Sequence, residues 1–208
     1  LRRCGDDNIV TQEAVKDTFI DWGDELEKTA CSQGVLIAAL RYARRLARRK
    51  NDWSQGNWLL QRQDALRKAA RERFWQDDEN CFVSNGQLSA ASQIWMVLAD
   101  VVEPELAEKA MRKALTIRDF PRIETPYLHH YYVMALLRAG LKEEAEEHIK
   151  NYWGGMLNAG ADTFWECWDG VDPDSSPYGG KVVNSYCHAW SCTPAYIIRR
   201  FLLPDRRE

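Results

Sequence analysis

Apolar residues recur at a helical spacing along most of the 208-residue chain. Over residues 25–50 they form a stripe close to the 3.6-residue period, which predicts a long amphipathic helix. We expect Asp24 to be its N-cap and Glu27 to be the capping-box partner at the third helical position. The same spacing predicts six further helices, over residues 57–75, 87–101, 104–116, 126–138, 141–153 and 188–202.

Two residues set boundaries in this pattern. Pro104 suits the first turn of the helix over 104–116. Gly140 is expected to cap the end of the helix over 126–138. No strand-rich region stands out, because the β-favouring residues near Tyr131 continue a helical pattern. The prediction is therefore an all-α fold of about seven helices, in one domain that spans residues 1–208.

One long segment interrupts the helices. Residues 154–187 are rich in Gly, Asp, Ser and Pro. Loops longer than about 12–15 residues inside a compact domain are usually functional or disordered. This segment contains Phe164, Trp165, Trp168 and Tyr178, and disordered segments rarely carry such residues. We therefore expect an ordered functional loop.

The overall composition excludes several classes of partner. The chain is 45% hydrophobic and 28% charged, which is typical of a soluble globular protein, and the cytoplasm is slightly favoured over the periplasm or secretion. No stretch approaches the roughly 18 apolar residues that a membrane span needs. A net charge of -3 predicts no nucleic-acid or membrane-surface binding. The basic run over residues 41–50 is interrupted by apolar positions and is interpreted as a solvated helix face.

Cysteine usage gives no metal-type pair. The six cysteines lack a CxxC spacing, so they are interpreted first as small buried residues and second as a disulfide framework. A zinc site built from His129 and His130 with Cys187 and His188 is disfavoured, because the i,i+4 spacing of helical metal sites is missing. Residues 169–176 lack the glycine and glutamate of an EF-hand loop, which favours an Asx-type turn over a calcium site. No cofactor is predicted.

Within the long loop, Glu166 is flanked by large aromatic side chains. Aromatic rings pack on the apolar faces of sugars. Glycoside hydrolysis needs two carboxyl groups, about 6.5–9.5 Å apart in inverting enzymes. The alternative is a carboxylate that caps a helix or binds loop amides while the tryptophans Trp165 and Trp168 fill a core. The residues alone leave both interpretations open.

Two more positions could contribute to such a site. His188 could donate a hydrogen bond to a substrate hydroxyl or to a carboxylate, or could be a satisfied core histidine. A nucleophilic pair of Cys187 and His188 is disfavoured, since adjacent helical residues project in different directions. Trp22 is either a platform for a sugar or a hydrophobic staple. Asp21 beside it is either a ligand or a cap.

Four motifs occur in the order found in bacterial α-L-rhamnosidases: Phe19-Ile20-Asp21-Trp22, Thr125-Pro126-Tyr127, Asp162-Thr163-Phe164-Trp165-Glu166 and Asn184-Ser185-Tyr186-Cys187-His188-Ala189-Trp190-Ser191. The chain thus resembles glycoside hydrolase family 78, whose catalytic domain is an (α/α)6 six-hairpin barrel. The resemblance spans nearly the whole chain. It is most specific over residues 160–196, where Glu166 and His188 stand at a matching separation.

The resemblance implies a role for each matching residue. Glu166 corresponds to the general base of these inverting enzymes, which activates the water that attacks the anomeric carbon of a terminal α-L-rhamnoside. His188 corresponds to a histidine that lines the rhamnose pocket, and Trp22 resembles an aromatic residue that packs against the sugar. Trp165 and Trp168 are expected to support or line the same pocket. The implied partner is a rhamnose-containing carbohydrate, with no cofactor and no metal.

The chain also departs from the family pattern. The general acid of the family lies in an acidic motif with Arg and Trp, and residues 1–20 contain no such motif. A complete barrel has about twelve helices, and about seven are expected here. The chain is therefore either a fragment of a longer enzyme, which the start at Leu1 favours, or a truncated homologue. Alone it should hydrolyse little, and its exposed helix layer should favour a homodimer.

Two other functions are compatible with the sequence. Residues 133–147 resemble a tetratricopeptide helix–turn–helix, which would indicate an interaction module, although a second copy at the expected offset is missing. The same barrel also serves other six-hairpin glycosidases, such as unsaturated glucuronyl hydrolase, because a fold does not determine its chemistry.

Overall fold

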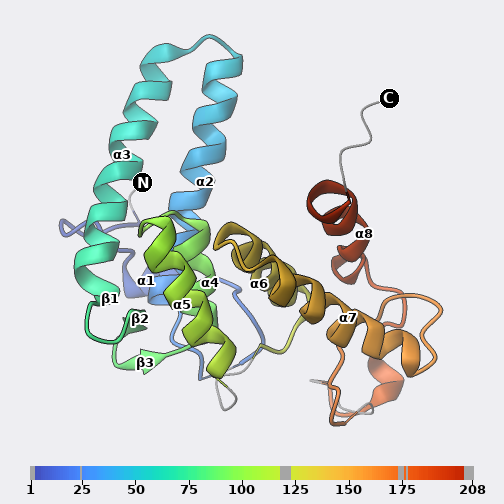
Figure 1. Cartoon of the computed structure of the whole chain (residues 1–208). Coiled ribbons are helices and arrows are strands. Elements are labelled where there is room, and N and C mark those ends of the chain that lie inside the picture. Colours follow the sequence, from blue (N-terminus) through green and yellow to red (C-terminus); the bar gives the residue numbers. More distant parts are fainter. Residues whose placement is uncertain (1–2, 24, 118–122, 173–175, 177, 204–208) are drawn as a thin grey trace. The chain divides into compact units, whose positions relative to one another are not determined.

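Helices dominate the computed structural model, which describes residues 3–23, 25–117, 123–172, 176 and 178–203 (Figure 1). This confirms the predicted helical fold class. Contacts within the chain separate two units, Leu1–Ile20 with Glu25–Arg122 and Asp21–Asp24 with Ile123–Glu208. The expectation of one domain over residues 1–208 stays a prediction. Asp24 and residues 173–175 of the expected Asx-type turn lie outside the described residues.

The first unit is built on a long helical hairpin. Its elements are α1 (Gln12–Lys16), α2 (Thr29–Arg49), α3 (Trp53–Phe74), β1 (Trp75–Gln76), β2 (Cys81–Ser84), β3 (Gln87–Leu88), α4 (Ala90–Leu98) and α5 (Pro104–Thr116). Helices α2 and α3 run side by side in opposite directions (Figure 1), α4 packs on α2, and α5 packs on α4. Asp52 caps α3 by accepting from the Gln55 backbone N–H at 3.0 Å, so α3 starts earlier than the predicted residue 57. Pro104 begins α5, as predicted.

The predicted start of the first long helix is wrong. Helix α2 begins at Thr29, with Lys28 as its N-cap residue, so Glu27 precedes the helix and is not at its third position. Glu27 still accepts from the Thr29 backbone N–H, at 3.2 Å, but from outside the helix. Gln87 explains the difference: its side chain accepts from the Glu27 N–H at 2.8 Å and donates to the Glu25 carbonyl at 3.0 Å. These bonds hold residues 25–27 in a non-helical path.

A small antiparallel sheet, in the order β1-β2-β3, was not predicted. Trp75 pairs with Phe82, and Val83 pairs with Leu88. The turn between β2 and β3 is Asn85-Gly86, and both residues have positive φ, +47° and +83°. Asn-Gly is the preferred dipeptide of a type I′ hairpin turn. The sheet also explains why α4 begins at Ala90 instead of residue 87: Gln87 and Leu88 are paired in β3, and the Ser89 hydroxyl caps the helix.

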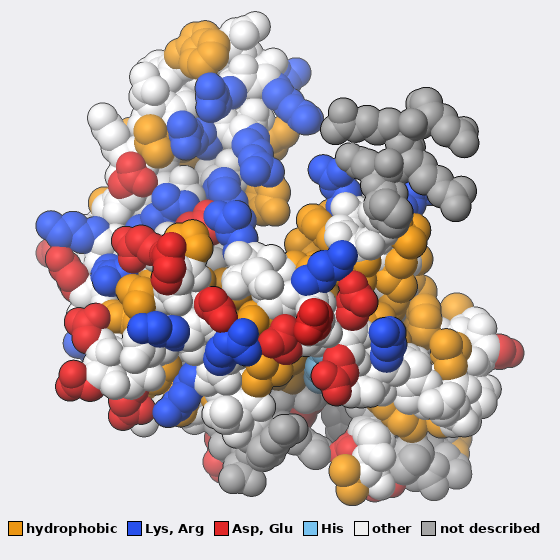
Figure 2. Space-filling model, viewed as in Figure 1, with side chains coloured by type: hydrophobic (Ala, Val, Ile, Leu, Met, Phe, Trp, Pro, Cys, Tyr) orange, Lys and Arg blue, Asp and Glu red, His pale blue; other side chains and the backbone are white. Residues whose placement is uncertain are grey.

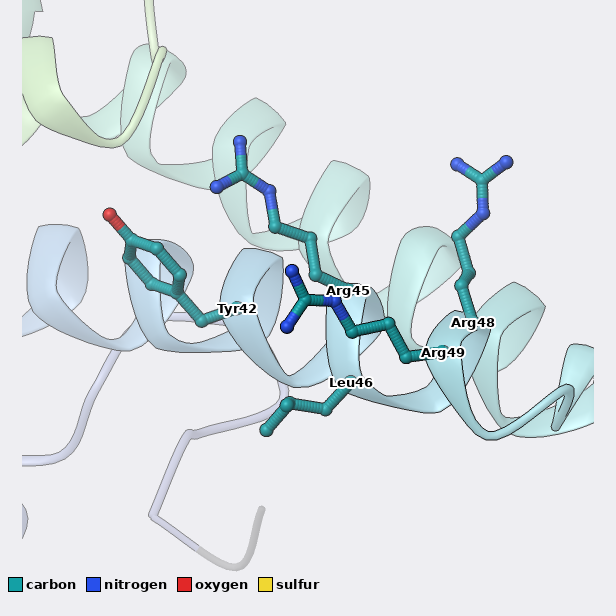
Figure 3. Close-up of a pocket in the computed structure, with 5 residues that line it drawn as sticks. All are labelled: Tyr42, Arg45, Leu46, Arg48 and Arg49. Carbon is teal, nitrogen blue, oxygen red and sulfur yellow. The ribbon is translucent and has the colours of Figure 1, made fainter.

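The basic run lies on an exposed part of α2. Figure 3 shows Tyr42, Arg45, Leu46, Arg48 and Arg49 along this helix, and Figure 2 shows Lys and Arg side chains gathered over the α2–α3 hairpin. The Arg45 guanidinium lies 5.4 Å from the centroid of the Tyr42 ring, and that of Arg48 lies 5.8 Å from the Trp53 ring. Cation–π contacts of this kind at exposed sites are worth about 0.5–1 kcal/mol. The arrangement is that of a solvated helix face.

The second unit contains two longer helices and a set of short ones. Its elements are α6 (Pro126–Arg138), α7 (Lys142–Asn158), the 3-10 turns η1 (Lys181–Val183) and η2 (Ala189–Ser191), α8 (Pro194–Ile197) and the π-helical turn η3 (Ile198–Leu202). Gly140 follows α6 with φ +81°, which confirms its capping role. The predicted helix over 188–202 is broken, because Pro194 takes a first-turn position and starts a new helix there. Across the described residues, no helix is both long and apolar enough to span a bilayer.

Helix α7 runs past Gly154 and Gly155, where the long loop was expected to begin. It continues to Asn158, so the long loop begins at Ala159 instead of residue 154. Gly155 serves packing here: a Cβ atom at this position would lie 2.9 Å from Nε1 of Trp168. The glycine therefore lets the Trp168 indole lie against the helix.

Two histidines hold α6 and α7 together. His129 Nδ1 lies 2.9 Å from His148 Nε2, and the His129 ring lies 3.7 Å from the Tyr152 ring. Burial lowers the pKa of His129 well below its usual value and that of His148 to about 4. Both rings are therefore neutral at pH 7, and one donates to the other. His129 is thus paired with His148 and not with the zinc ligands considered above.

We predict that this pair makes the second unit sensitive to acid. The unfolded chain binds protons at these histidines near pH 6.5, whereas the folded chain resists until about pH 4 at His148. Stability is therefore complete above pH 6.5 and falls as the pH drops toward 4, by about 3 kcal/mol for His148. Urea unfolding between pH 7.5 and 4 measures this loss. His148→Gln should flatten the slope, and an unchanged slope in that variant contradicts the assignment.

We predict that Gly34→Ala destabilises the first unit. A Cβ at residue 34 would lie 2.6 Å from the backbone oxygen of Trp95 in α4, and a backbone cannot yield as a flexible side chain can. The overpacking should cost about 2 kcal/mol. The matched control is Gly56→Ala in α3, where a Cβ would meet only Arg48 at 3.8 Å. That variant should gain up to about 1 kcal/mol of helix propensity in the same urea titration.

Candidate functional site

Backbone hydrogen bonds bring two distant parts of the loop together. The Glu166 N–H donates to the Ser185 carbonyl at 2.8 Å, and the His188 N–H donates to the Phe164 carbonyl at 2.9 Å. Residues 164–166 and 185–188 therefore run alongside each other. This pairing places the two residues that the sequence singled out, Glu166 and His188, in one site.

Glu166 is a buried carboxylate with two donors already in place. The residue is 9% exposed. Oε1 accepts from the Tyr178 hydroxyl at 2.7 Å, and Oε2 accepts from the Ser185 backbone N–H at 3.0 Å. The Trp190 indole N–H donates to the Glu166 carbonyl at 2.8 Å. A carboxylate can accept about four hydrogen bonds, so Glu166 has acceptor capacity left for a water or a substrate hydroxyl.

His188 faces the same carboxylate without touching it. Its Nε2 lies 3.8 Å from Glu166 Oε1, which is too long for a direct hydrogen bond. Its Nδ1 accepts from the Trp190 backbone N–H at 3.4 Å. In the neutral ring the proton is then on Nε2. His188 therefore presents a donor beside Glu166, as the first of its two interpretations requires.

Trp22 joins this site although it lies far away in the sequence. Its ring is edge-on to Tyr178, with centroids 5.6 Å apart, and edge-on to Trp190, at 5.3 Å. The Tyr127 ring lies 6.4 Å from that of Trp190. His188 packs on Trp190 at 4.6 Å. Aromatic rings thus line the site beside Glu166 and His188.

Asp21 fixes the position of Trp22. This buried carboxylate accepts from the backbone N–H groups of Trp22 at 3.0 Å, Glu124 at 2.8 Å and Thr125 at 3.0 Å. Burial raises its pKa, and the backbone donors act in the opposite direction. Thr125 in turn caps α6 by accepting from the Leu128 N–H at 3.1 Å. Asp21 therefore binds backbone amides and ties Trp22 to the start of α6.

Trp165 and Trp168 form a second group of rings. They meet edge-on at 5.5 Å, and Trp165 also meets Tyr186 at 5.3 Å. Trp168 packs against Gly155 of α7. These contacts lie within the loop and against α7, and the expectation that both rings support or line the sugar pocket stays a prediction.

The cysteines take different environments. Cys31, Cys81 and Cys167 are buried, as expected, whereas Cys187 and Cys192 are exposed. All six are free thiols, so a disulfide framework is not formed. Burial raises the pKa of Cys167 to about 11, and its thiol donates to Asn184 at 3.3 Å. Cys167 is therefore a protonated packing residue at neutral pH.

Asp169 opens the segment that was considered for calcium. Asp169 accepts from the backbone N–H of Val171 at 2.8 Å and of Asp172 at 3.4 Å, which is the Asx-type arrangement favoured over calcium. Within the described ranges, no group of three or more His, Cys, Asp or Glu side chains could hold a metal ion.

The sequence interpretation missed two contributors. Tyr178 was noted only as an aromatic residue of the loop, and Trp190 only as part of a motif. Trp190 stands two positions after His188, within the same motif, which could have indicated its place. Nothing in the local sequence shows that the Tyr178 hydroxyl reaches Glu166, because that contact depends on how the Gly-rich segment folds back.

Comparisons with known proteins agree on one family. The sequence profile of the bacterial alpha-L-rhamnosidase six-hairpin glycosidase domain matches residues 5–202. A solved structure of a rhamnosidase from Klebsiella oxytoca with rhamnose bound is 45% identical, with a TM-score of 0.90 over 98% of this chain. A GH78 family rhamnosidase of Bacillus sp. GL1 has a TM-score of 0.76 over 96% of this chain at 22% identity, which supports the fold. Among curated proteins, none matches.

The chain spans only part of these relatives. It covers 40% of the Klebsiella protein and 22% of the Bacillus protein. The family match nevertheless extends over nearly all of its 208 residues. The chain therefore belongs to the bacterial α-L-rhamnosidase six-hairpin glycosidase family.

Proposed function

We propose that this chain carries the general base of an inverting glycosidase that releases L-rhamnose from terminal α-L-rhamnosides, and that Glu166 is this base. The supporting observation is the setting of Glu166: a buried carboxylate, held by Tyr178 and Ser185, beside the His188 imidazole. The relative from Klebsiella oxytoca, which holds rhamnose, supports the choice of sugar.

In this mechanism Glu166 takes a proton from a water molecule as that water attacks the anomeric carbon. The glycosidic bond breaks on the opposite face, and a general acid protonates the leaving oxygen. Inversion follows because the water arrives opposite to the leaving group. This water would donate a hydrogen bond to one of the Glu166 oxygens, each of which can accept a further bond.

The neighbouring side chains would bind the sugar. His188 Nε2 carries a hydrogen that can be donated to a sugar hydroxyl. Trp22, fastened by Asp21, would pack its ring against the apolar face of the sugar. Trp165 and Trp168 would hold the loop that carries Glu166.

The general acid is proposed to lie outside residues 1–208, in a longer chain. The motif expected for it is missing before Asp21, and this chain covers 40% of its Klebsiella relative. The chain alone should then bind rhamnose but hydrolyse rhamnosides poorly, because a base cannot protonate the leaving group. A homodimer of this chain remains a prediction, which sedimentation analysis can check.

Glu166→Gln should lower the turnover of an aryl α-L-rhamnoside by about 100- to 10,000-fold, measured on the longest protein that contains this chain. The amide keeps the shape of the side chain and removes the base. The matched control is Glu147→Gln on the exposed surface of α7, which should keep parental activity. If Glu166→Gln retains most of the activity, Glu166 is not the base. Release of a sugar other than L-rhamnose would refute the proposed substrate.

Trp22→Ala should weaken the binding of L-rhamnose about 10-fold, because the sugar loses an aromatic face worth about 1.5 kcal/mol. Titration calorimetry on the chain measures this directly. Trp58→Ala is the control, since that ring is 49% exposed on α3 and outside the site. Equal weakening in both variants, or none in either, would contradict a specific role for Trp22.

A further inference from the structure

The Tyr178 side chain connects two parts of the candidate site. Its hydroxyl donates to Glu166 Oε1 at 2.7 Å, and its ring lies edge-on to Trp22, with centroids 5.6 Å apart. The residue as a whole is 51% exposed. Because so much of the residue is exposed, burial of the Tyr178 ring contributes little to the stability of the fold. Its hydroxyl is the part that makes a specific contact.

The backbone around Tyr178 is held in place by a chain of hydrogen bonds. The Tyr178 N–H donates to the Ser176 hydroxyl at 3.1 Å, and that hydroxyl donates to the Asn184 side chain at 2.7 Å. Asn184 also accepts from the Cys167 thiol, next to Glu166, at 3.3 Å. Gly179 follows with φ +92°, a conformation that glycine adopts without strain. These bonds connect the Tyr178 backbone, through Ser176 and Asn184, to the residue that follows Glu166.

We propose that Tyr178 is the positioning residue of Glu166: its hydroxyl fixes the carboxylate in one orientation through Oε1 while the Ser185 N–H fixes Oε2. This inference rests on the proposed function. With both oxygens held, the remaining acceptor positions of the carboxylate point in defined directions. A base that is held in this way loses little conformational entropy when it adopts the orientation that the attacking water requires.

The Tyr178 hydroxyl also occupies the Glu166 oxygen that faces His188. His188 Nε2 lies 3.8 Å from the same Oε1 atom. Without the phenol, Oε1 would be a buried acceptor short of a donor, which is costly. The His188 imidazole is a donor close to that atom and could turn toward it. The phenol thus leaves the imidazole N–H available.

The ionisation of the groups around Glu166 fits this assignment. Among the described side chains and backbone groups, those that face it are the Tyr178 phenol, the His188 imidazole, the Cys167 thiol and the Ser185 N–H. The hydrogen bond to Glu166 raises the pKa of Tyr178, and burial raises that of Cys167 to about 11. Both are therefore protonated at neutral pH, and the phenol remains a donor.

Tyr178→Phe tests the proposal, because it keeps the ring beside Trp22 and removes only the donor. On the longest protein that contains this chain, kcat for an aryl α-L-rhamnoside should fall about 10- to 100-fold, with KM changed by less than about threefold. The pH profile of kcat/KM should also change, because the hydrogen bond from the titratable Tyr178 phenol is lost. Tyr178→Ala should in addition raise KM through the lost contact with Trp22.

The control is Tyr196→Phe, an equally conservative change on the exposed side of α8. It should leave kcat, KM and the pH profile unchanged. A spectroscopic measurement tests the contact itself: with 13Cζ-labelled tyrosine, Glu166→Gln should lower the pH at which the Tyr178 signal titrates, because the anionic acceptor is gone.

Each result decides a different point. A parental kcat and pH profile in Tyr178→Phe, in a protein that hydrolyses rhamnosides, overturns the positioning role and leaves the proposed function standing. An unchanged titration of Tyr178 in Glu166→Gln also overturns the positioning role. A parent protein that hydrolyses no rhamnoside overturns the proposed function, and the positioning role with it.

Discussion

The hydrogen bonds between residues 164–166 and residues 185–188 are the constraint on which the candidate site depends. These two segments have no helix of their own to fix them, and the stretch between them is long and rich in glycine. The exchange of backbone bonds at Glu166 and His188 supplies the order that a helix or sheet would otherwise give. It satisfies the backbone of a partly buried loop and sets the carboxylate beside the imidazole. Every further contact of Glu166 builds on that placement.

A second constraint acts on the aromatic side of the site. Asp21 accepts hydrogen bonds from three backbone N–H groups, two of them at the start of α6. The cost of burying this carboxylate is offset by those donors, and the benefit is a fixed Trp22. The segment that carries Trp22 precedes α2 in the sequence but belongs to the unit of α6 and α7. The buried Asp21 carboxylate thus connects the backbone of Trp22 to the start of α6.

The sequence predicted those parts of the structure that local rules decide. Pro104 and Gly140 marked helix ends because each has one preferred place in a helix, and both are found there. The separation of Glu166 and His188 indicated a shared site through the family resemblance. The start of α2 escaped prediction because Gln87, some 60 positions away, holds residues 25–27. The short sheet escaped because strands of two to four residues leave almost no periodicity, and the hairpin dipeptide Asn85-Gly86 was overlooked.

The packing of Trp168 on Gly155 anchors the start of the loop to α7. Before Asp169 the chain is fastened to α7, and from Asn184 onward it is fastened to Glu166 and Phe164. Between these anchors lie residues such as Val171, which is 91% exposed and makes no demand on the core. A substitution at Val171 should therefore cost little core packing, whereas a side chain added at Gly155 would displace Trp168, which lies two positions after Glu166.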